Sequence, residues 1–468
     1  MSDPQRKAII IGGGLVGSLC ACFMARRGYK VVVFEKREDI RKFPEKRGRS
    51  INLSLSDRGR AALRLVGLEE VVLKASIAMR GRLLHGVDGT TKSVLYDPVK
   101  NQVNDKYLSP YRYINLKTPI EADYPQVFIG DAILKNNAYF SRFCNNPYYF
   151  NLQCIYSVGR NFLNQILLAA AETYPNVSLY FNHKLIRSNI NEGNVTVLNT
   201  ETYETFEDTA DLIIGADGAF SALRRSLQQC HLFNYSQNYI EHGYLELSIP
   251  AKRNDQMVPN HLHIWPRGQF MMIALPNKDG SWTVTLFMPF QRFEELNCDE
   301  KVVQFFGVTF PDAVPLIGEQ ELTEQFFKRK PSALISIKAT LHHFGSKFLI
   351  IGDAAHAMVP FYGQGMNAGF EDCIILNELL DKTEDIEEAI KEYSKVRIED
   401  AHAICDLAMY NYIEMRDLVT KPTFYLRKRL DNLLSGLFPD TWVPLYNSVC
   451  FSRMKYTKCI ENRKWQDA

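Results

Sequence analysis

A glycine-rich turn near the N-terminus constrains the fold of this chain more than any other feature. The apolar run 7–11 leads into Gly-Gly-Gly-Leu-Val-Gly at 12–17, which is followed by an apolar segment to about Arg27 and by a second apolar run at 30–34. A strand, a GxGxxG turn, a helix and a second strand in this order are typical of a β-α-β unit that binds a dinucleotide. Glu35 ends the second strand, where an acidic side chain meets the ribose of such a ligand. The sequence therefore predicts a dinucleotide site at this turn.

Residues 348–369 contain a second glycine-rich loop between a strand and a helix. The apolar run 348–351 predicts a buried strand, Gly352-Asp353 follows it, and a helix is expected to begin near Met366. Backbone N–H groups and the positive end of the helix dipole then point at one place, which suits a phosphate or a reduced flavin ring. Asp353 can accept a hydrogen bond from a sugar hydroxyl. Taken alone, the segment is also compatible with an ordinary buried β-loop-α unit.

Hydrophobic periodicity places the remaining elements. The apolar run 211–214 predicts a strand that leads into Asp217-Gly218, which again combines an acid with a glycine. Helices are expected at 57–68 and 161–173, strands at 176–188 and 195–209, several alternating strands within 240–290, and helices from about 370 onward. The alternation within 240–290 favours an antiparallel sheet with one covered face.

The size of the chain indicates two or three domains, because 468 residues exceed what one hydrophobic core usually supports. A net charge of +2 offers no basic surface for nucleic acid. The ten cysteines lack a CxxC pair or zinc spacing, so we interpret them as reduced packing residues and expect no metal site. No apolar stretch approaches the ~18 residues that a membrane-spanning helix needs, and the chain is expected to be soluble.

Residues 103–153 differ from the rest of the chain. They are rich in tyrosine, asparagine and phenylalanine and show no sustained period. So long a loop without structure of its own is unusual in a compact domain, and we interpret it as an atypical insertion. Its composition is what translated AT-rich noncoding DNA would give. The hypothesis is therefore a retained intron or a gene-model artefact, with a genuine insertion as the alternative.

The three motifs, in this order and spacing, resemble the single-component FAD-dependent aromatic hydroxylases. A closer resemblance, to the branch of that family that acts on L-kynurenine, is carried by GRSINLSLS (48–56), AMRGRLLHG (78–86), YSVGRNFLNQILL (156–168), HIWPRGQFMMIALPN (263–277), VPFYGQGMNAGFEDC (359–373) and MYNYIEMRD (409–417). The resemblance implies an α/β fold with a discontinuous Rossmann-type FAD-binding domain (1–102, 154–225 and 335–380), an antiparallel-sheet substrate domain (226–334) and a helical C-terminal region (381–468).

The resemblance also implies the ligands and their contacts. FAD is the cofactor, NADPH is a co-substrate without a domain of its own, and O2 supplies the oxygen atom that is added to L-kynurenine at position 3 of its ring. The implied FAD contacts are Gly12, Gly14, Val16, Gly17, Glu35, Arg37, Ser54, Arg160, Leu185, Asp217, Asp353, Gly365, Met366 and Asn367. No catalytic side chain is expected, and His356 is interpreted as structural.

Four residues are implied to hold the substrate. Arg82 matches the arginine that binds the amino-acid carboxylate, and Tyr96 matches the tyrosine that shares this contact. Asn411 and Tyr446 match residues that complete the site. A guanidinium fork suits a carboxylate better than a lysine does, and tyrosine and asparagine add neutral donors.

Three other interpretations stay open. They are a related flavin hydroxylase with another substrate such as a quinone precursor, a FAD-binding protein that the 103–153 insertion makes inactive, and a simple NAD dehydrogenase. The first would leave Arg82 without a carboxylate, and the last would leave Asp217 and Asp353 without a role. The resemblance further implies an anchor in the mitochondrial outer membrane, facing the cytosol, after a segment like NRKWQ (462–466), whereas the chain as given ends at Ala468.

Overall fold

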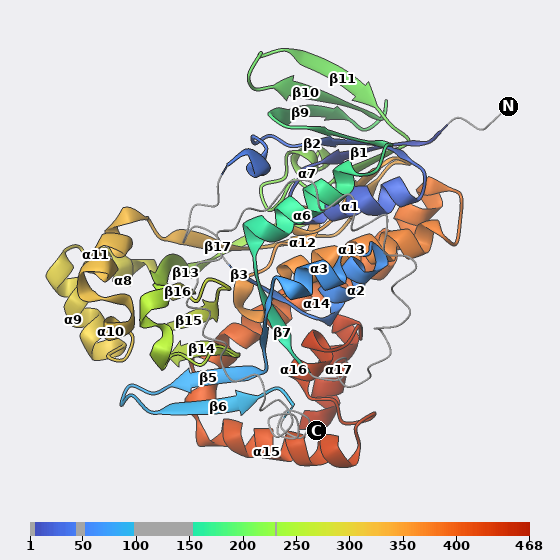
Figure 1. Cartoon of the computed structure of the whole chain (residues 1–468). Coiled ribbons are helices and arrows are strands. Elements are labelled where there is room, and N and C mark those ends of the chain that lie inside the picture. The colour runs from blue at the N-terminus through green and yellow to red at the C-terminus, as the bar shows by residue number, and fades with distance from the viewer. Residues whose placement is uncertain (1–4, 44–51, 98–152, 230–231) are drawn as a thin grey trace.

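The computed structural model describes residues 5–43, 52–97, 153–229 and 232–468. It contains two large β-sheets, one in the upper part of Figure 1 and one at its lower left, with helices packed around both. The predicted insertion at 103–153 lies outside the described residues except for its last residue, Gln153.

The first sheet has the arrangement expected for dinucleotide binding. Its six strands run in the order β18 (His343–Phe344), β19 (Phe348–Ile350), β12 (Leu212–Gly215), β1 (Lys7–Ile11), β2 (Lys30–Phe34) and β8 (Val177–Tyr180). All neighbouring strands are parallel except β18 and β19. Valine, isoleucine and leucine dominate these strands because both faces of the sheet are covered. The strands predicted at 7–11, 30–34, 211–214 and 348–351 are therefore confirmed.

Alternate side chains of this sheet pack against different layers. Ala8 and Ile10 belong to the core that includes α1 (Leu15–Arg26), α6 (Arg160–Glu172) and α13 (Gly365–Leu380). Ile9 and Ile11 point to the other face and pack against a small antiparallel sheet of β9 (His183–Asn189), β10 (Asn194–Asn199) and β11 (Thr205–Thr209). The alternation follows from the two-residue period of a strand.

Three predicted elements were wrong in their extent. The strands expected at 176–188 and 195–209 each divide in two, at turns where Asn182 and Tyr203 have φ angles of 59° and 61°. The helix expected at 57–68 ends earlier, because Gly67 has a φ of 77° and separates α2 (Asp57–Leu65) from α3 (Glu69–Lys74). A left-handed residue ends a helix or a strand whatever the hydrophobic pattern around it.

The second sheet has seven strands in the order β17 (Ser332–Ala339), β13 (Tyr235–Ile249), β16 (Trp282–Pro289), β15 (Met271–Pro276), β14 (His261–Pro266), β5 (Gly81–His85) and β6 (Thr91–Leu95). The alternating runs within 240–290 are β13 to β16, which pair antiparallel as predicted, whereas β14 also pairs in parallel with β5. The expectation of a single covered face was wrong, because helices cover both faces. One of its faces packs against α8 (Phe290–Glu295), α9 (Asp299–Thr309), α10 (Val314–Ile317) and α11 (Glu319–Lys328). The other face packs against α14 (Ile386–Arg416).

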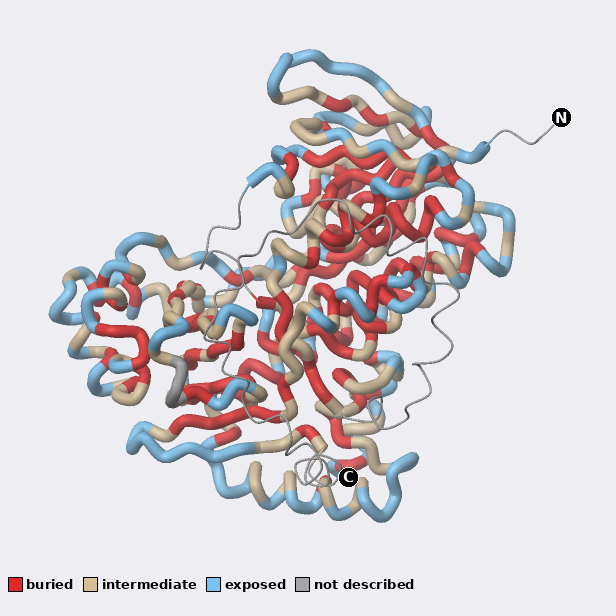
Figure 2. Tube along the Cα trace, in the orientation of Figure 1, coloured by how far each residue is buried: buried red, intermediate tan, exposed pale blue. Residues whose placement is uncertain are grey.

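Helices complete the C-terminal part, as predicted from about residue 370 onward. They are α13, α14, α15 (Pro422–Leu437), α16 (Leu445–Cys450) and α17 (Tyr456–Asp467). A small sheet of β3 (Asn52–Leu55), β7 (Ile155–Gly159) and β4 (Ile77–Met79) lies between the two large sheets, and α7 (Ala222–Leu227) and α12 (Asp353–His356) are short. Figure 2 shows that the buried chain continues from one large sheet to the other. The division into three domains stays a prediction.

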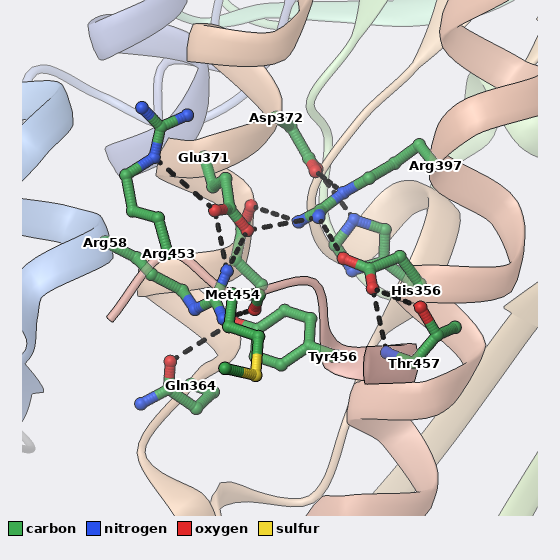
Figure 3. A network of polar contacts seen from close by, with 12 residues as sticks. Arg58, His356, Gln364, Glu371, Asp372, Arg397, Arg453, Met454, Tyr456 and Thr457 are labelled. Carbon is green, nitrogen blue, oxygen red and sulfur yellow. Dashed lines mark hydrogen bonds and ion pairs between the residues drawn. The ribbon is translucent and has the colours of Figure 1, made fainter. Parts of the chain in front are cut away.

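A network of buried charges joins α2, α13 and α14 (Figure 3). Arg397 on α14 donates to Asp372 at 2.7 Å, to Glu371 at 3.1 Å and to Asp400 at 3.0 Å. Arg58 on α2 donates to Glu371 at 2.7 Å. All five side chains are buried, so each charge needs the opposite charge beside it.

Asp372 connects this network to the turn that follows β19. Its Oδ2 accepts hydrogen bonds from the backbone N–H of Gly352 and from His356 Nε2, both at 2.7 Å. Burial alone would raise the pKa of Asp372, but His356 and Arg397 beside it hold that pKa well below its ordinary value. His356, for which the sequence offered no partner, therefore has a structural contact.

We expect Asp372→Asn to lower the free energy of unfolding at pH 7 by about 3–5 kcal/mol, because it leaves Arg397 buried without a full counter-charge. A carboxyl group with a depressed pKa in the folded state adds stability above its unfolded pKa of about 3.9, and this stability is lost as the pH falls toward the folded value. Urea unfolding measured between neutral pH and about pH 3 should thus show a smaller pH dependence for the variant. Asp440→Asn, at an exposed position, is the control and should match the parent protein.

Candidate functional site

A large cavity opens at the carboxyl ends of the parallel strands and extends to the second sheet. Its volume is about 1510 Å³. The residues expected to contact FAD that line it are Gly12, Gly14, Val16, Glu35, Arg37, Ser54, Arg160, Leu185, Asp217, Asp353, Gly365 and Met366. Ligands of open α/β sheets bind at this edge, where loops after neighbouring strands converge. The structure thus brings motifs that are far apart in the sequence into the wall of one cavity. Of the expected FAD contacts, only Gly17 and Asn367 do not line it.

Gly12 and Gly17 determine how closely the first turn packs. Gly12 has a φ of 106°, and a Cβ there would lie 2.5 Å from the carbonyl oxygen of Ala216. A Cβ on Gly17 would lie 1.9 Å from the carbonyl oxygen of Gly12. Glycine at both positions lets α1 begin directly against the turn, so the positive end of its dipole lies at the cavity. Gly17 therefore shapes the site without lining it.

Two carboxylates line the cavity at the ends of strands on either side of β1. Glu35 accepts hydrogen bonds at 2.8 Å from the backbone N–H of Gly13 and from Arg37 Nε. Burial alone would raise the pKa of Glu35, but the contacts with Arg37 hold it below its ordinary value. Asp217 Oδ2 accepts from the N–H of Ala222 at 2.6 Å, whereas its buried Oδ1 has no hydrogen-bond partner among the described residues. A ligand that offers hydroxyl donors fits this pair.

The second glycine loop presents the N-terminus of a long helix to the same cavity. Helix α13 begins at Gly365, and Gly365 and Met366 both line the cavity. Asp353, the first residue of α12, lines it as well. The first backbone N–H groups of α13 and its dipole favour an anionic group at this end.

Asn367 lies behind the cavity wall. Its side chain is fully buried and donates to the carbonyl oxygens of Ser54 at 2.8 Å and Gly363 at 2.7 Å. Its Oδ1 accepts from the backbone N–H of Ser56 at 2.9 Å. These contacts use the whole amide to fasten β3 to the glycine loop, which is a different role from the expected contact with the flavin.

A second, smaller cavity lies next to the first and is lined by three of the four expected substrate residues. Its volume is about 40 Å³. Arg82, Tyr96 and Tyr446 line it together with apolar side chains. Five residues line both cavities, which are Ser54, Ile273, Leu275, Pro360 and Gly363. A single layer of side chains therefore separates the expected substrate residues from the large cavity.

Arg82 is buried on β5 between a carboxylate and aromatic rings. Its guanidinium carbon lies 4.1 Å from the ring centre of Tyr446, and its Nη1 lies 3.4 Å from Glu414 Oε1. The rings of Tyr96 and Tyr446 are stacked with their centres 5.3 Å apart. Burial alone would lower the pKa of Arg82, but the two tyrosines and Glu414 raise it above its ordinary value, so the side chain stays charged. A charged guanidinium with so distant an acidic partner suits a second carboxylate.

Asn411 is the expected substrate residue that the structure keeps out of the smaller cavity. It is 2% exposed, and its Nδ2 donates to the carbonyl oxygen of Phe361 at 2.7 Å. Phe361 lines the cavity, and its ring stacks on Tyr412 with centres 3.7 Å apart. Asn411 therefore holds one wall of the site in place.

The sequence did not predict two residues of the site. Tyr362 lines the smaller cavity, and its ring lies nearly parallel to that of Tyr446 at 5.5 Å. Glu414 is the acidic neighbour of Arg82. The spacing gave a signal for Glu414, because it stands three residues after Asn411 and such residues share one face of a helix.

We expect Asn411→Ala to lower the free energy of unfolding by about 1–3 kcal/mol, because the carbonyl oxygen of Phe361 would stay buried without its donor. Chemical denaturation measures the change. Asn297→Ala, at an exposed position, should alter stability by less than about 0.5 kcal/mol. Unchanged stability for Asn411→Ala would contradict the wall-holding role and favour a direct ligand contact.

Comparison with known proteins identifies relatives over nearly the whole chain. The family described as FAD binding domain matches residues 5–408. The chain is 51% identical over 461 residues to the kynurenine 3-monooxygenase of Anopheles gambiae, covering 98% of this chain and 84% of that protein. It is 43% identical over 468 residues to the kynurenine 3-monooxygenase of Sus scrofa, covering 99% and 88%.

Solved structures with a similar fold are more distant in sequence. A tetrameric form of 2-methyl-3-hydroxypyridine-5-carboxylic acid oxygenase superimposes with a TM-score of 0.64 at 19% identity, over 89% of this chain and 94% of that one. PqsL of P. aeruginosa, in complex with 2-aminobenzoylacetate, superimposes with a TM-score of 0.63 at 16% identity, over 88% and 97%. These two likenesses concern the fold alone, and the predicted fold class is confirmed.

Proposed function

We propose that this chain, which belongs to the kynurenine 3-monooxygenase family, hydroxylates L-kynurenine at position 3 of its ring with NADPH and O2. The observation that carries the proposal is the buried, charged Arg82 in a cavity one layer of side chains away from the large cavity. An aromatic amino acid offers its carboxylate to such an arginine and can direct its ring toward the neighbouring cavity. A substrate without a carboxylate would leave the guanidinium buried with Glu414 as its distant partner.

The residues that line the large cavity match the chemical groups of FAD. The start of α1 at the glycine turn would bind the pyrophosphate, and Glu35 would bind the adenosine ribose. Asp217 Oδ1, which has no partner within the described part of the chain, would accept from hydroxyl groups of the flavin half together with Asp353. The N-terminus of α13 at Gly365 would face the ring end, where negative charge develops. When bound, FAD takes hydride from NADPH and activates O2 for transfer of one oxygen atom.

The residues of this chain would orient the substrate and keep water away. Arg82 would bind the substrate carboxylate in place of its 3.4 Å contact with Glu414. Tyr96 and Tyr446, stacked beside it, would offer hydroxyl donors and flat surfaces. Ile273 and Leu275 supply apolar wall between the two cavities, and excluding water there would suppress wasteful loss of the activated oxygen.

The proposed reaction is tested with the purified protein. We expect a yellow flavin spectrum and NADPH oxidation that is stimulated by L-kynurenine and yields 3-hydroxykynurenine. We expect Arg82→Met to lower kcat/KM for L-kynurenine by about 100-fold or more, because a charge-assisted contact worth about 1.5–3 kcal/mol is lost together with its orientation. The flavin content of this variant should be unchanged, since Arg82 does not line the large cavity.

The control for this experiment is Arg292→Met, at an exposed position on α8, which should leave both flavin content and kcat/KM unchanged. Flavin binding without substrate-stimulated oxidation would overturn the proposed reaction and leave a FAD-binding protein. Absence of flavin would overturn the assignment of the large cavity.

The proposal includes a location at the cytosolic side of the mitochondrial outer membrane. It rests on the family resemblance. Within the described ranges, no helix is both long and apolar enough to cross a membrane. Subcellular fractionation tests the location, and recovery of the protein outside the mitochondrial fraction would overturn it.

A further inference from the structure

Lys428 is a basic side chain near the smaller cavity that the proposed reaction does not use. It is half-buried on α15. Tyr425 lies on the same side of that helix, because residues three apart share a face, and the ring centre of Tyr425 is 3.1 Å from Lys92 Nζ on β6. Lys428 therefore faces the second sheet, whose edge strand β6 lies beside α15 (Figure 1).

The register of β5 and β6 relates this contact to Arg82. Lys92 pairs with Leu84, and Val94 pairs with Arg82. All four side chains share one face of the sheet, because the side chains of a strand alternate. Two residues of a strand rise about 6.6 Å and one turn of a helix about 5.4 Å. The step from Lys92 to the level of Arg82 thus matches one turn of α15.

Three charged side chains from three elements meet beside the smaller cavity. They are Arg82 on β5, Glu414 on α14 and Lys428 on α15. Arg82 Nη1 and Glu414 Oε1 are 3.4 Å apart. Asp431, the other acidic side chain that acts on Lys428, accepts a hydrogen bond from Arg427 Nε at 2.9 Å. Lys428 forms no ion pair of its own with a described residue.

The balance of these charges decides whether Arg82 can accept a second carboxylate. Glu414 alone would neutralise Arg82, and the carboxylate of a ligand would then meet the like charge of Glu414. A protonated Lys428 leaves the group with an excess positive charge, which a ligand carboxylate can neutralise. Burial and the charge of Arg82 lower the pKa of Lys428, whereas Asp431 and Glu414 beside it act to raise that pKa. Lys428 therefore loses its proton at a lower pH than an exposed lysine does.

We propose that Lys428 is a positioning residue that keeps Arg82 available for the substrate carboxylate by compensating the charge of Glu414. The inference rests on the proposed function, because it takes the substrate to be an amino acid whose carboxylate binds Arg82. When that carboxylate occupies Arg82, Lys428 remains as the cation beside Glu414, so neither carboxylate is left without a counter-charge. Lys428 thereby favours ligands that carry a carboxylate over ligands that lack one.

Calorimetric titration of the FAD-loaded chain with L-kynurenine, without NADPH and therefore without turnover, tests this role. We expect Lys428→Met to weaken binding about tenfold, because Glu414 then competes with the ligand for Arg82. Binding of kynuramine, the analogue that lacks the carboxylate, should be unchanged. Lys428→Arg keeps the positive charge and should bind L-kynurenine like the parent protein at about pH 7.

The pH dependence of the Kd separates this role from a packing role. A lysine with a lowered pKa supplies its charge below that pKa and loses it as the pH rises through it. The Kd for L-kynurenine should therefore rise in the parent protein between about pH 7 and about pH 10, and rise less in Lys428→Arg, whose guanidinium stays charged. Titration of L-kynurenine itself is common to both proteins and cancels in the comparison.

The matched control is Lys328→Met, at an exposed position on α11, which should bind like the parent protein. Adding Glu414→Gln to Lys428→Met should restore most of the lost affinity, because the competing carboxylate is gone. An unchanged Kd for Lys428→Met, an equal loss with kynuramine, or the same pH dependence in the parent and Lys428→Arg would overturn the inference alone. A parent protein that does not bind L-kynurenine would overturn the proposed function and this inference with it.

Discussion

The carboxylate of Asp372 is the contact on which the arrangement of the site depends. It stands on α13 and receives the backbone N–H of Gly352 after β19, the ring of His356 on α12 and the guanidinium of Arg397 on α14. One side chain on α13 therefore fixes the end of β19, the short helix α12 and the long helix α14 relative to one another. Because the charge is buried, it is tolerated only while these donors remain. The shape of the large cavity's wall therefore depends on the same hydrogen bonds.

The two cavities share five lining residues, so a shift of these residues changes both cavities. Buried amides hold this wall by binding backbone carbonyls. Asn367 joins Ser54 to Gly363, and Asn411 supports Phe361. Backbone geometry near this wall is thus set by side chains that line neither cavity. Arg82 lies on the side of the smaller cavity, where it is buried beside the ring of Tyr446. Its guanidinium charge stays available to bind a carboxylate.

The sequence predicted the features that depend on local pattern. The β-α-β unit, the strands before Asp217 and Asp353 and the alternating strands of the second sheet all follow from periodicity and glycine placement, and their carboxylates line one cavity. It did not predict that Asn367 and Asn411 line neither cavity, because their contacts with Ser54 and Phe361 join positions 313 and 50 residues apart in the chain. The helix break at Gly67 was missed because a left-handed glycine leaves no mark on hydrophobic periodicity.

The order of strands in the first sheet has a consequence for how the protein is made. Strand β1, at the very start of the chain, pairs with β12, and β12 pairs with β19, which ends only at Ile350 of the 468 residues. A ribosome must therefore release most of the chain before the parallel sheet can close. Until then one edge of β12 lacks its neighbour, and unpaired strand edges are where nascent chains aggregate. Translation that stops before β19 would yield an aggregation-prone product that chaperones must hold, rather than a smaller flavoprotein.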